Sequence, residues 1–216
     1  MLEQLLNEDA DPIEIIGMLK SVASFDTAYK TKVRHYTLQE HTLLVLSEFD
    51  KYFSQIDTFL PKNLFRFILS VHDIGKPKAY LSGNINNQYA ETVSMIEKIR
   101  PFLPFSQAEI NFGLSVINGD PIGHFFQDKI ASISAAEKIK SMNISTQFPV
   151  KDFFRMLTIY YQCDAGSYTK DAGGLPFLER LFLYTNGSKT MDSEKGVLRF
   201  SPIFETKYRT LETAIK

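Results

Sequence analysis

The sequence predicts an all-α fold, and three observations support this prediction. Apolar residues recur mainly at the three- and four-residue spacing of amphipathic helices, and few segments alternate with the period of two that is typical of strands. Helix-start signals precede several of these segments. The 216 residues, 44% of them hydrophobic and 23% charged, are enough to bury a core without disulfides. Eighteen Phe and ten Tyr, with no Trp, are expected to fill a helical core.

In the first half of the chain, each predicted helix has a start signal. Asp11-Pro12 reads as an N-cap followed by the first helical residue and predicts a helix to about Ala23. A capping box at residues 37–40 predicts a second helix to about Phe53. Pro61 begins a third, with an apolar face, and Gly75 and Pro77 are expected to end it. A polar loop then leads to a helix over about 89–99.

The second half of the chain is predicted in the same way. A capping box at Ser106 predicts a helix to about residue 117, and Asp120-Pro121 predicts one long helix to about Met142. The remaining expected elements are a helix over about 150–164, a short apolar helix over 175–185, a turn-rich stretch to 196, a strand or extended arm over 197–204 and a helix over 206–215. We therefore expect one helical domain, residues 1–185, with a C-terminal extension, residues 186–216, packed on it.

Charge and cysteine content narrow the function classes. The net charge of −1 provides no overall field that would recruit nucleic acid or an anionic membrane. No apolar run approaches the roughly 20 residues that span a bilayer, and the N-terminal residues lack a signal-peptide pattern. Cys163 is the only cysteine, so no internal disulfide forms and a reducing compartment is the simpler interpretation. We expect a cytoplasmic protein with no membrane contact.

Histidines and aspartates near the ends of three predicted helices are the candidate chemical groups. His41 lies early in the second helix, His72 and Asp73 lie at the end of the third, and Asp164 ends the helix over 150–164. Two imidazoles and two carboxylates are a suitable ligand set for a divalent ion such as Mn, Fe, Co, Ni or Zn. The sequence thus predicts a metal site where these helices meet.

The motifs that contain these residues resemble those of the HD-domain metal-dependent phosphohydrolases. EHTLLVL (40–46), VHDIGKP (71–77) and CDAGSY (163–168) match the H…HD…D signature of that family in order and approximate spacing. The resemblance covers roughly residues 30–170. It implies an HD-domain-like helical bundle in which His41, His72, Asp73 and Asp164 hold one divalent metal ion (Mn, Fe, Co, Ni, Zn or Mg). The implied activity is hydrolysis of a phosphoester in a nucleotide or nucleic-acid-derived substrate.

The chain also departs from the fuller ligand set of that family. Gln88 stands where many members have a histidine for a second metal, and Asn118 and Asp120, with His124 one turn further on, stand near the next such position. Since Gln is a poor ligand for transition metals, we expect one ion. The departure also argues against the diiron oxygenase branch of the superfamily.

The resemblance assigns further roles around the metal. The ion would lower the pKa of a bound water and polarise a phosphoryl oxygen. Asp73 is the candidate for holding the attacking water as well as the metal. Lys76 is the candidate for contacting a phosphate and offsetting charge in the transition state. Arg34 and His35, before the His41 helix, are the next candidates for binding the phosphate, and Lys78 is a weaker one.

Four other residues are weaker candidates. Tyr168 and Tyr161 are close to Asp164 in sequence and are candidates for stacking on a base. Asp120 or His124 would carry a proton if the helix after Pro121 passes the site. The expected partner is a small phosphorylated substrate, most often a nucleotide, because a near-neutral chain favours a small substrate over a long polyanion.

Each assignment has an alternative that requires no chemistry. His72 and Asp73 would also serve as a helix C-cap, Asp164 as a turn residue, and Lys76 as a solvated lysine. Two rival functions follow. One is a non-catalytic HD module that binds a nucleotide or a protein partner, which the substitution at Gln88 makes credible. The other is a purely structural helical domain.

Overall fold

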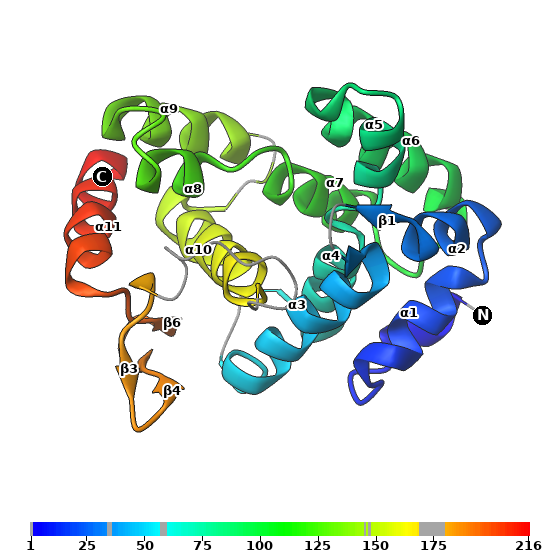
Figure 1. Ribbon diagram of the computed structural model, residues 1–216, viewed down its shortest axis with the longest axis horizontal. Helices are drawn as coiled ribbons and strands as arrows, with labels where there is room; N and C mark the ends of the chain where they lie inside the picture. The colour runs from blue at the N-terminus through cyan, green and yellow to red at the C-terminus, as the bar shows by residue number, and fades with distance from the viewer. Residues whose placement is uncertain (1, 34–35, 57–59, 145, 147, 169–179) are drawn as a thin grey trace.

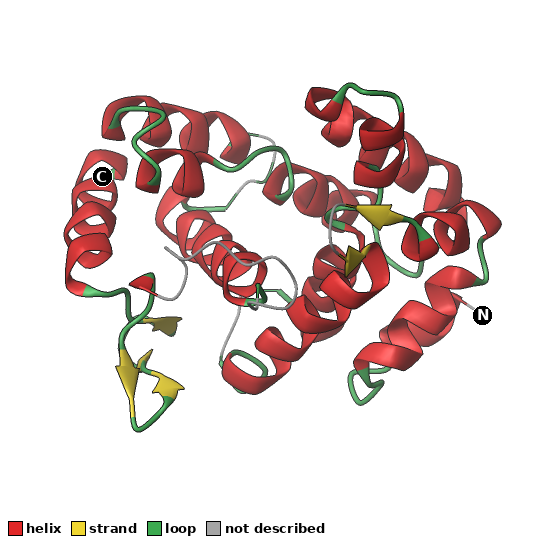
Figure 2. Ribbon diagram, in the orientation of Figure 1, coloured by secondary structure: helices red, strands yellow, loops and turns green. Residues whose placement is uncertain are grey.

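The protein is all-α, as predicted, and its only strands are two-residue segments among the residues described (Figure 2). The computed structural model describes residues 2–33, 36–56, 60–144, 146, 148–168 and 180–216. The α-helices are α1 (Pro12–Lys20), α2 (Ala23–Lys30), α3 (Leu38–Tyr52), α4 (Lys62–Val71), α5 (Lys76–Leu81), α6 (Gln88–Ile99), α7 (Gln107–Val116), α8 (Pro121–Phe126), α9 (Ser132–Asn143), α10 (Val150–Gly166) and α11 (Pro202–Ile215).

Short 3-10 helices and three two-stranded antiparallel ladders connect these helices. The 3-10 helices are η1 (Leu2–Leu6), η2 (Ile85–Asn87) and η3 (Arg100–Phe102). The paired strands are β1 (Lys32–Val33) with β2 (Tyr36–Thr37), β3 (Tyr184–Thr185) with β4 (Ser188–Lys189), and β5 (Met191–Asp192) with β6 (Val197–Leu198).

Helix α3 lies at the centre of the arrangement. It packs against α4 on one side and α10 on the other, and α1 and α2 cover its N-terminal half (Figure 1). At the other end of the molecule α11 lies along α9, and β6 packs on α10. Helices α3, α4 and α10 carry the candidate metal ligands, so the fold places their ends in one neighbourhood.

The predicted helix starts are confirmed by their hydrogen bonds. Asp11, Thr37 and Ser106 each accept from the backbone N–H three residues on, and the Glu at that third position accepts from the backbone N–H of the capping residue. These reciprocal bonds satisfy donors that the first turn of a helix leaves without partners. The Thr37 box matters most here, because it fixes where α3 begins and so where His41 lies.

Two of the predicted helices are wrong. Instead of one helix over 121–142, α8 ends at Phe126 and α9 begins at Ser132, because Asp128 adopts a positive φ of 58° that a right-handed helix does not allow. Of the apolar helix expected over 175–185, residues 175–179 lie outside the described residues. The rest is mainly extended: Phe182 forms an antiparallel bridge with Phe200, and β3 follows.

Two helices were not predicted, and the C-terminal segment is mixed. Residues 23–30 form α2, and residues 76–81 form α5 directly after the expected stop. The segment over 197–204 begins as strand β6 but enters α11 at Pro202.

Aromatic side chains fill the core, as the composition predicted. The largest fully buried side chains include Tyr29, Phe25, Phe49, Phe53, Phe65 and Phe153. Phe49 of α3 stacks on Phe65 of α4 with ring centroids 5.1 Å apart. The Tyr29 hydroxyl donates to the buried Ser70 carbonyl at 2.8 Å, which ties α2 to α4 two residues before His72.

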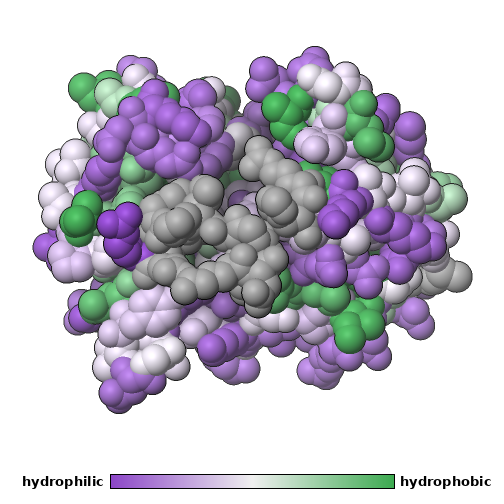
Figure 3. Space-filling model, viewed as in Figure 1, coloured by the Kyte–Doolittle hydropathy of each residue, from purple (hydrophilic) through white to green (hydrophobic). Residues whose placement is uncertain are grey.

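Apolar side chains on the outside are scattered. The face in Figure 3 is mainly hydrophilic, with small separate hydrophobic areas among the described residues. In the described part of the chain, none of the helices has both the length and the apolar character needed to cross a bilayer.

Gly75 is required by close packing rather than by its backbone angle. Its φ of −84° is open to any residue, so it is not the left-handed helix stop that was expected. A Cβ at this position would lie 2.7 Å from the Gln88 carbonyl oxygen and closer still to the Thr92 nitrogen. The Gly75 N–H also donates to the Thr92 hydroxyl at 3.1 Å. The turn after Asp73 therefore packs directly on the backbone of α6.

Substituting alanine for Gly75 is expected to lower the free energy of unfolding by about 1–3 kcal/mol, because backbone atoms of α6 cannot move aside cheaply. Gly17→Ala is the matched control. Gly17 lies within α1 and a Cβ there would meet nothing within 4 Å, so this change is expected to stabilise by up to about 1 kcal/mol. Chemical denaturation measures both. Equal effects of the two substitutions would contradict the close packing.

Candidate metal centre

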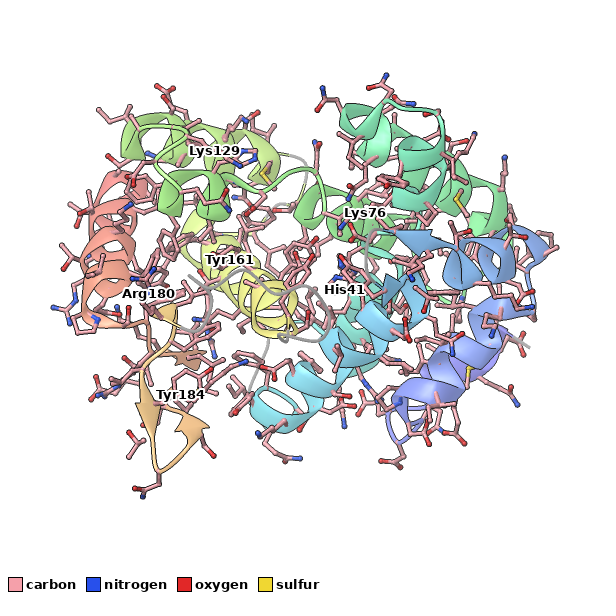
Figure 4. The ribbon with its side chains drawn as sticks, in the orientation of Figure 1. His41, Lys76, Lys129, Tyr161, Arg180 and Tyr184 are labelled. Carbon is pink, nitrogen blue, oxygen red and sulfur yellow. The ribbon has the colours of Figure 1, made fainter. Side chains whose placement is uncertain are left out.

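The four predicted ligands come from three helix ends. His41 lies in the first turn of α3, four residues after the capping residue Thr37. His72 is the C-cap of α4, and Asp73 follows in the turn that leads into α5. Asp164 lies in the last turn of α10. His41, His72 and Asp73 are buried, and Figure 4 shows His41 and Lys76 close to the middle of the molecule.

Their polar atoms converge on one point. Asp164 Oδ1 lies 3.1 Å from His41 Nε2 and 3.6 Å from His72 Nε2. Asp73 Oδ2 lies 3.8 Å from His41 Nε2 and 3.7 Å from His72 Nε2. One atom each of His41, His72 and Asp73 falls within a mutual 4.8 Å, a group that could hold a metal ion.

These separations fit a shared ion. Two atoms bound to one transition-metal ion at about 2.0–2.2 Å, at tetrahedral or octahedral angles, lie roughly 2.8–3.6 Å apart. Two of the four contacts fall within that range, and the longest, at 3.8 Å, is slightly beyond it. A small adjustment of Asp73 would complete the coordination.

Three of the converging atoms are also buried without a hydrogen bond. Among the described residues, His41 Nε2, His72 Nε2 and Asp164 Oδ1 have no hydrogen-bond partner of acceptable geometry. Buried polar atoms are rarely left in this state, because each one costs on the order of 1–3 kcal/mol. Three such atoms facing one another are what a cation-binding site requires, and the residues present therefore fit a divalent ion.

The other ring nitrogens have partners that fix the tautomers. His72 Nδ1 lies 2.6 Å from the Leu69 carbonyl oxygen, which only accepts, so Nδ1 carries the proton. His41 Nδ1 lies 3.4 Å from the Ser167 hydroxyl, which donates its own proton to the Asp164 carbonyl at 2.7 Å. Both rings then present the Nε2 lone pair inward, the orientation that a metal-ligating histidine needs.

Asp73 is held by two further side chains. The Lys76 ammonium donates to Oδ2 at 2.6 Å, and the Gln88 amide donates to Oδ1 at 2.5 Å. Gln88 was expected to be a poor ligand, and the structure places it as a hydrogen-bond donor to a ligand instead. Lys76 and Gln88 thus fix the orientation of the Asp73 carboxylate from both of its oxygens.

Two tyrosines lie beside His41. The ring centroids of Tyr36 and Tyr168 are 5.2 and 5.0 Å from that of His41, and the two hydroxyls are 3.3 Å apart. Burial raises the pKa of Tyr168, so its hydroxyl stays protonated and can donate a hydrogen bond. Tyr160 packs edge-on against His72 with ring centroids 6.0 Å apart.

The charges of the centre oppose the effect of burial. Burial raises the pKa of Asp73, but the Lys76 ammonium and His72 outweigh it, and the pKa lies below its ordinary value. Burial likewise raises the pKa of Asp164, but the close approach of the His41 and His72 rings outweighs it and brings the pKa well below the usual range. For His72, burial lowers the pKa, but the Asp73 and Asp164 carboxylates outweigh it and raise it.

These shifts predict that metal binding releases protons. Because the pKa of His72 is raised above its ordinary value of about 6.5, the ring in the metal-free centre stays protonated to a higher pH than a free imidazole. A metal ion binds only the neutral ring. Apparent metal affinity should therefore rise as the pH increases from about 6 through the raised pKa of His72. In the metal-free protein the sign is opposite: the stability that protonated His72 contributes is complete below about pH 6.5 and is lost as the pH rises through the folded-state pKa.

Calorimetric titration with Co(II) in buffers of different ionisation enthalpy measures the number of protons released. We expect a positive number at pH 6.5 that falls towards pH 8.5. Affinity that is independent of pH over this interval would contradict the assignment of His72 as a ligand.

Other predicted site residues lie outside the described part of the chain or have no recorded hydrogen bond or ion pair with the four ligands, although Asp120 lies near enough to Asp164 for burial and that carboxylate to raise its pKa. Arg34 and His35 lie outside the described residues. Asp120 caps α8, accepting from the Gly123 N–H at 2.7 Å. In the described part of the chain, neither Asp120 nor His124 forms a hydrogen bond or ion pair with the four ligands. Tyr161 is buried against Phe126 with ring centroids 5.7 Å apart, so it is not available to a base.

Sequence reasoning did not find three contributors. Tyr36, Tyr160 and Ser167 touch the ligand histidines but carry no motif of their own. Ser167 follows Asp164 by three residues within CDAGSY, and that proximity was the only available signal.

Comparisons with protein-family models, with curated proteins and with solved structures found no match to this chain. What the structure itself shows is a helical chain in which buried His41, His72 and Asp73, with Asp164 beside them, could hold a metal ion.

Proposed function

We propose that the chain is a metal-dependent phosphohydrolase with one divalent ion, similar to the HD-domain enzymes. The observation that supports this most is the convergence of His41 Nε2, His72 Nε2 and Asp164 Oδ1, all buried and without hydrogen bonds, around the inward oxygen of Asp73. The motifs that suggested the family are the same ones that supply these atoms.

The bound ion and Asp73 would have different roles in the reaction. When bound, the divalent ion would supply a water of lowered pKa and polarise a phosphoryl oxygen. Asp73 would hold and orient rather than accept a proton, because its pKa is lowered and both its oxygens already accept hydrogen bonds.

Lys76 would stabilise the phosphate. Its ammonium already lies beside Asp73 Oδ2, and it remains charged because the neighbouring Asp73 carboxylate raises its pKa despite burial. A fixed cation at the edge of the metal centre can offset negative charge that develops on a phosphoryl oxygen. The hydroxyls of Tyr36 and Tyr168 lie within the same neighbourhood.

The substrate class we propose is a small phosphoester such as a nucleotide. The chain has a net charge of −1, and a long polyanion normally requires many basic contacts. Arg34 and His35 remain predicted phosphate contacts, and Tyr168, whose ring lies beside His41, remains a predicted substrate contact.

The test is a panel of mononucleotides, cyclic nucleotides and a generic aryl phosphate, assayed with Mn, Co, Ni, Zn and Mg. We expect phosphoester cleavage with at least one metal, and its loss on chelation and in the Asp164→Ala variant. Turnover that survives both treatments would come from a contaminant, and absence of turnover with every metal would contradict the proposal.

One observation supports the non-catalytic module as a second candidate. Lys76 and Gln88 occupy both oxygens of Asp73, which leaves the centre fewer open groups than a hydrolase with two ions would have. A nucleotide that raises the melting temperature of the metal-loaded protein but is never cleaved would select this function.

A further inference from the structure

The C-terminal extension contacts two of the ligand-bearing helices, α3 and α10, through the largely buried side chain of one lysine. Lys189, the last residue of β4, has 8% of its side chain exposed. Its ammonium donates to Glu48 Oε2 at 2.5 Å and to the Gly166 carbonyl at 2.8 Å. It also lies over the Phe182 ring, 4.8 Å from the centroid. A lysine this buried is uncommon unless its charge is paired, as it is here.

The two acceptors belong to the two helices that hold the closest pair of ligand atoms. Glu48 lies on α3, two helical turns after His41. Gly166 ends α10, two residues after Asp164 and one before Ser167, the partner of His41 Nδ1. The lysine therefore joins α3 to the end of α10, the two helices that contribute the 3.1 Å contact between His41 and Asp164.

The packing leaves little freedom at this junction. A Cβ on Gly166 would lie 2.8 Å from the Lys189 ammonium and 3.0 Å from Glu48 Oε2. The ammonium thus occupies the space beside the helix end. It caps a carbonyl that the last turn of a helix leaves without a partner, at the end where the helix dipole favours a positive charge.

The extension that carries Lys189 is anchored independently on α10. The buried side chain of Gln162 accepts from the Leu198 N–H at 2.8 Å and donates to the Leu198 carbonyl at 2.7 Å. This pair of bonds fixes β6 against α10 two residues before Asp164. Because of this anchor, removing the Lys189 ammonium would loosen the end of α10 without releasing the whole extension.

We propose that Lys189 is a positioning residue of the metal centre. By bonding Glu48 on α3 and the last carbonyl of α10 together, it sets the distance between His41 and Asp164 and holds Ser167 against His41. Side chains that hydrogen-bond a metal ligand directly typically change metal affinity by about 10–100-fold when they are removed, and Lys189, which acts through the end of α10, is expected to fall at the lower end of this range. The inference rests on the metal-binding part of the proposed function and does not require catalysis.

The test compares the Co(II) dissociation constant and the visible absorption of bound Co(II) in the full chain and its variants. Lys189→Met is expected to weaken Co(II) binding about tenfold and to change the absorption band, because the coordination geometry changes. Lys195→Met is the matched control: Lys195 belongs to the same extension but pairs with Glu212 of α11 at 3.2 Å. We expect it to bind Co(II) within about twofold of the wild type, whatever its effect on melting temperature.

Glu48→Gln keeps the test decisive if Lys189→Met fails to fold. It removes the charge partner while preserving size, and it is expected to weaken Co(II) binding severalfold. Wild-type affinity and spectrum in whichever of these two variants folds would overturn the proposal, as would an equal loss in Lys195→Met. If the wild-type chain binds Co(II) but cleaves no phosphoester, the proposed hydrolase function is contradicted and the comparison of Co(II) affinities remains valid. If the wild-type chain binds no metal, both the proposed function and the role of Lys189 are contradicted.

Discussion

Replacing Asp73 by alanine is expected to abolish metal binding at micromolar concentrations and, with it, any phosphoester cleavage. The substitution removes the oxygen that faces both histidine Nε2 atoms, at 3.7 and 3.8 Å. It also leaves the Lys76 ammonium, whose side chain is only 20% exposed, as an uncompensated cation beside the site. Loss of an orienting residue alone costs about 10–100-fold in affinity, so loss of a ligand together with this repulsion should cost more than about 100-fold.

Asp73→Asn tests the contribution of the negative charge alone, since it keeps the side-chain volume and one carbonyl oxygen. It is expected to bind metal more weakly than the wild type but to remain folded. Asp26→Ala is the control for a change of one carboxylate: Asp26 is paired with Lys30 on α2, away from the centre, and its loss should leave the dissociation constant unchanged. Isothermal titration with Mn(II) and Co(II) measures all four proteins. Equal metal affinities for the wild type and Asp73→Ala would contradict the assignment of a metal centre at these residues.

Lys76→Met is expected to move two measurements in opposite directions. Its ammonium lies 2.6 Å from Asp73 Oδ2, the oxygen that an ion would share. Two unit charges 4 Å apart repel by about 4 kcal/mol at an effective dielectric constant of 20, which is larger than the roughly 1.4–2.8 kcal/mol that a lost orienting contact costs. Gln88 also still holds Asp73. Metal affinity should therefore rise by about tenfold or more.

Catalysis should fall in the same variant. Removing one fixed donor or charge that stabilises a transition state typically costs about 10²–10³ in kcat. Lys78→Met is the matched control, because Lys78, the weaker predicted phosphate contact, instead pairs with Glu91 at 2.7 Å and has 64% of its side chain exposed. We expect wild-type affinity and kcat from it. If Lys76→Met keeps the wild-type kcat, Lys76 does not contact the phosphate.

Local signals predicted the parts of the fold that depend on local hydrogen bonds. The capping boxes at Thr37 and Ser106 place the starts of α3 and α7 correctly, because a few neighbouring residues determine them. The break near Asp128 was not predicted, since a single residue of positive φ leaves little trace in apolar periodicity. The helix expected over 175–185 is contradicted in its described part, residues 180–185. Leu181 and Phe182 are apolar because they lie buried in the extended segment that pairs with residues near Phe200.

The candidate site was predictable to the extent that it consists of motifs. His41, His72, Asp73 and Asp164 were chosen from spacing and resemblance, and the structure brings their polar atoms within 4 Å of one another at four contacts. Their surroundings were not predictable. Ser167 touches a residue 126 positions earlier and Lys189 one 141 positions earlier, and single-sequence periodicity contains no information about such pairs.

The Gln162 amide has a consequence for how the protein behaves at high concentration. By taking both backbone groups of Leu198, it closes the outer side of the β5–β6 hairpin with a side chain from a helix. An open edge of this kind is a template on which another chain can add a strand, and its closure removes one route to aggregation. Gln162 is therefore expected to reduce self-association of the chain through this hairpin.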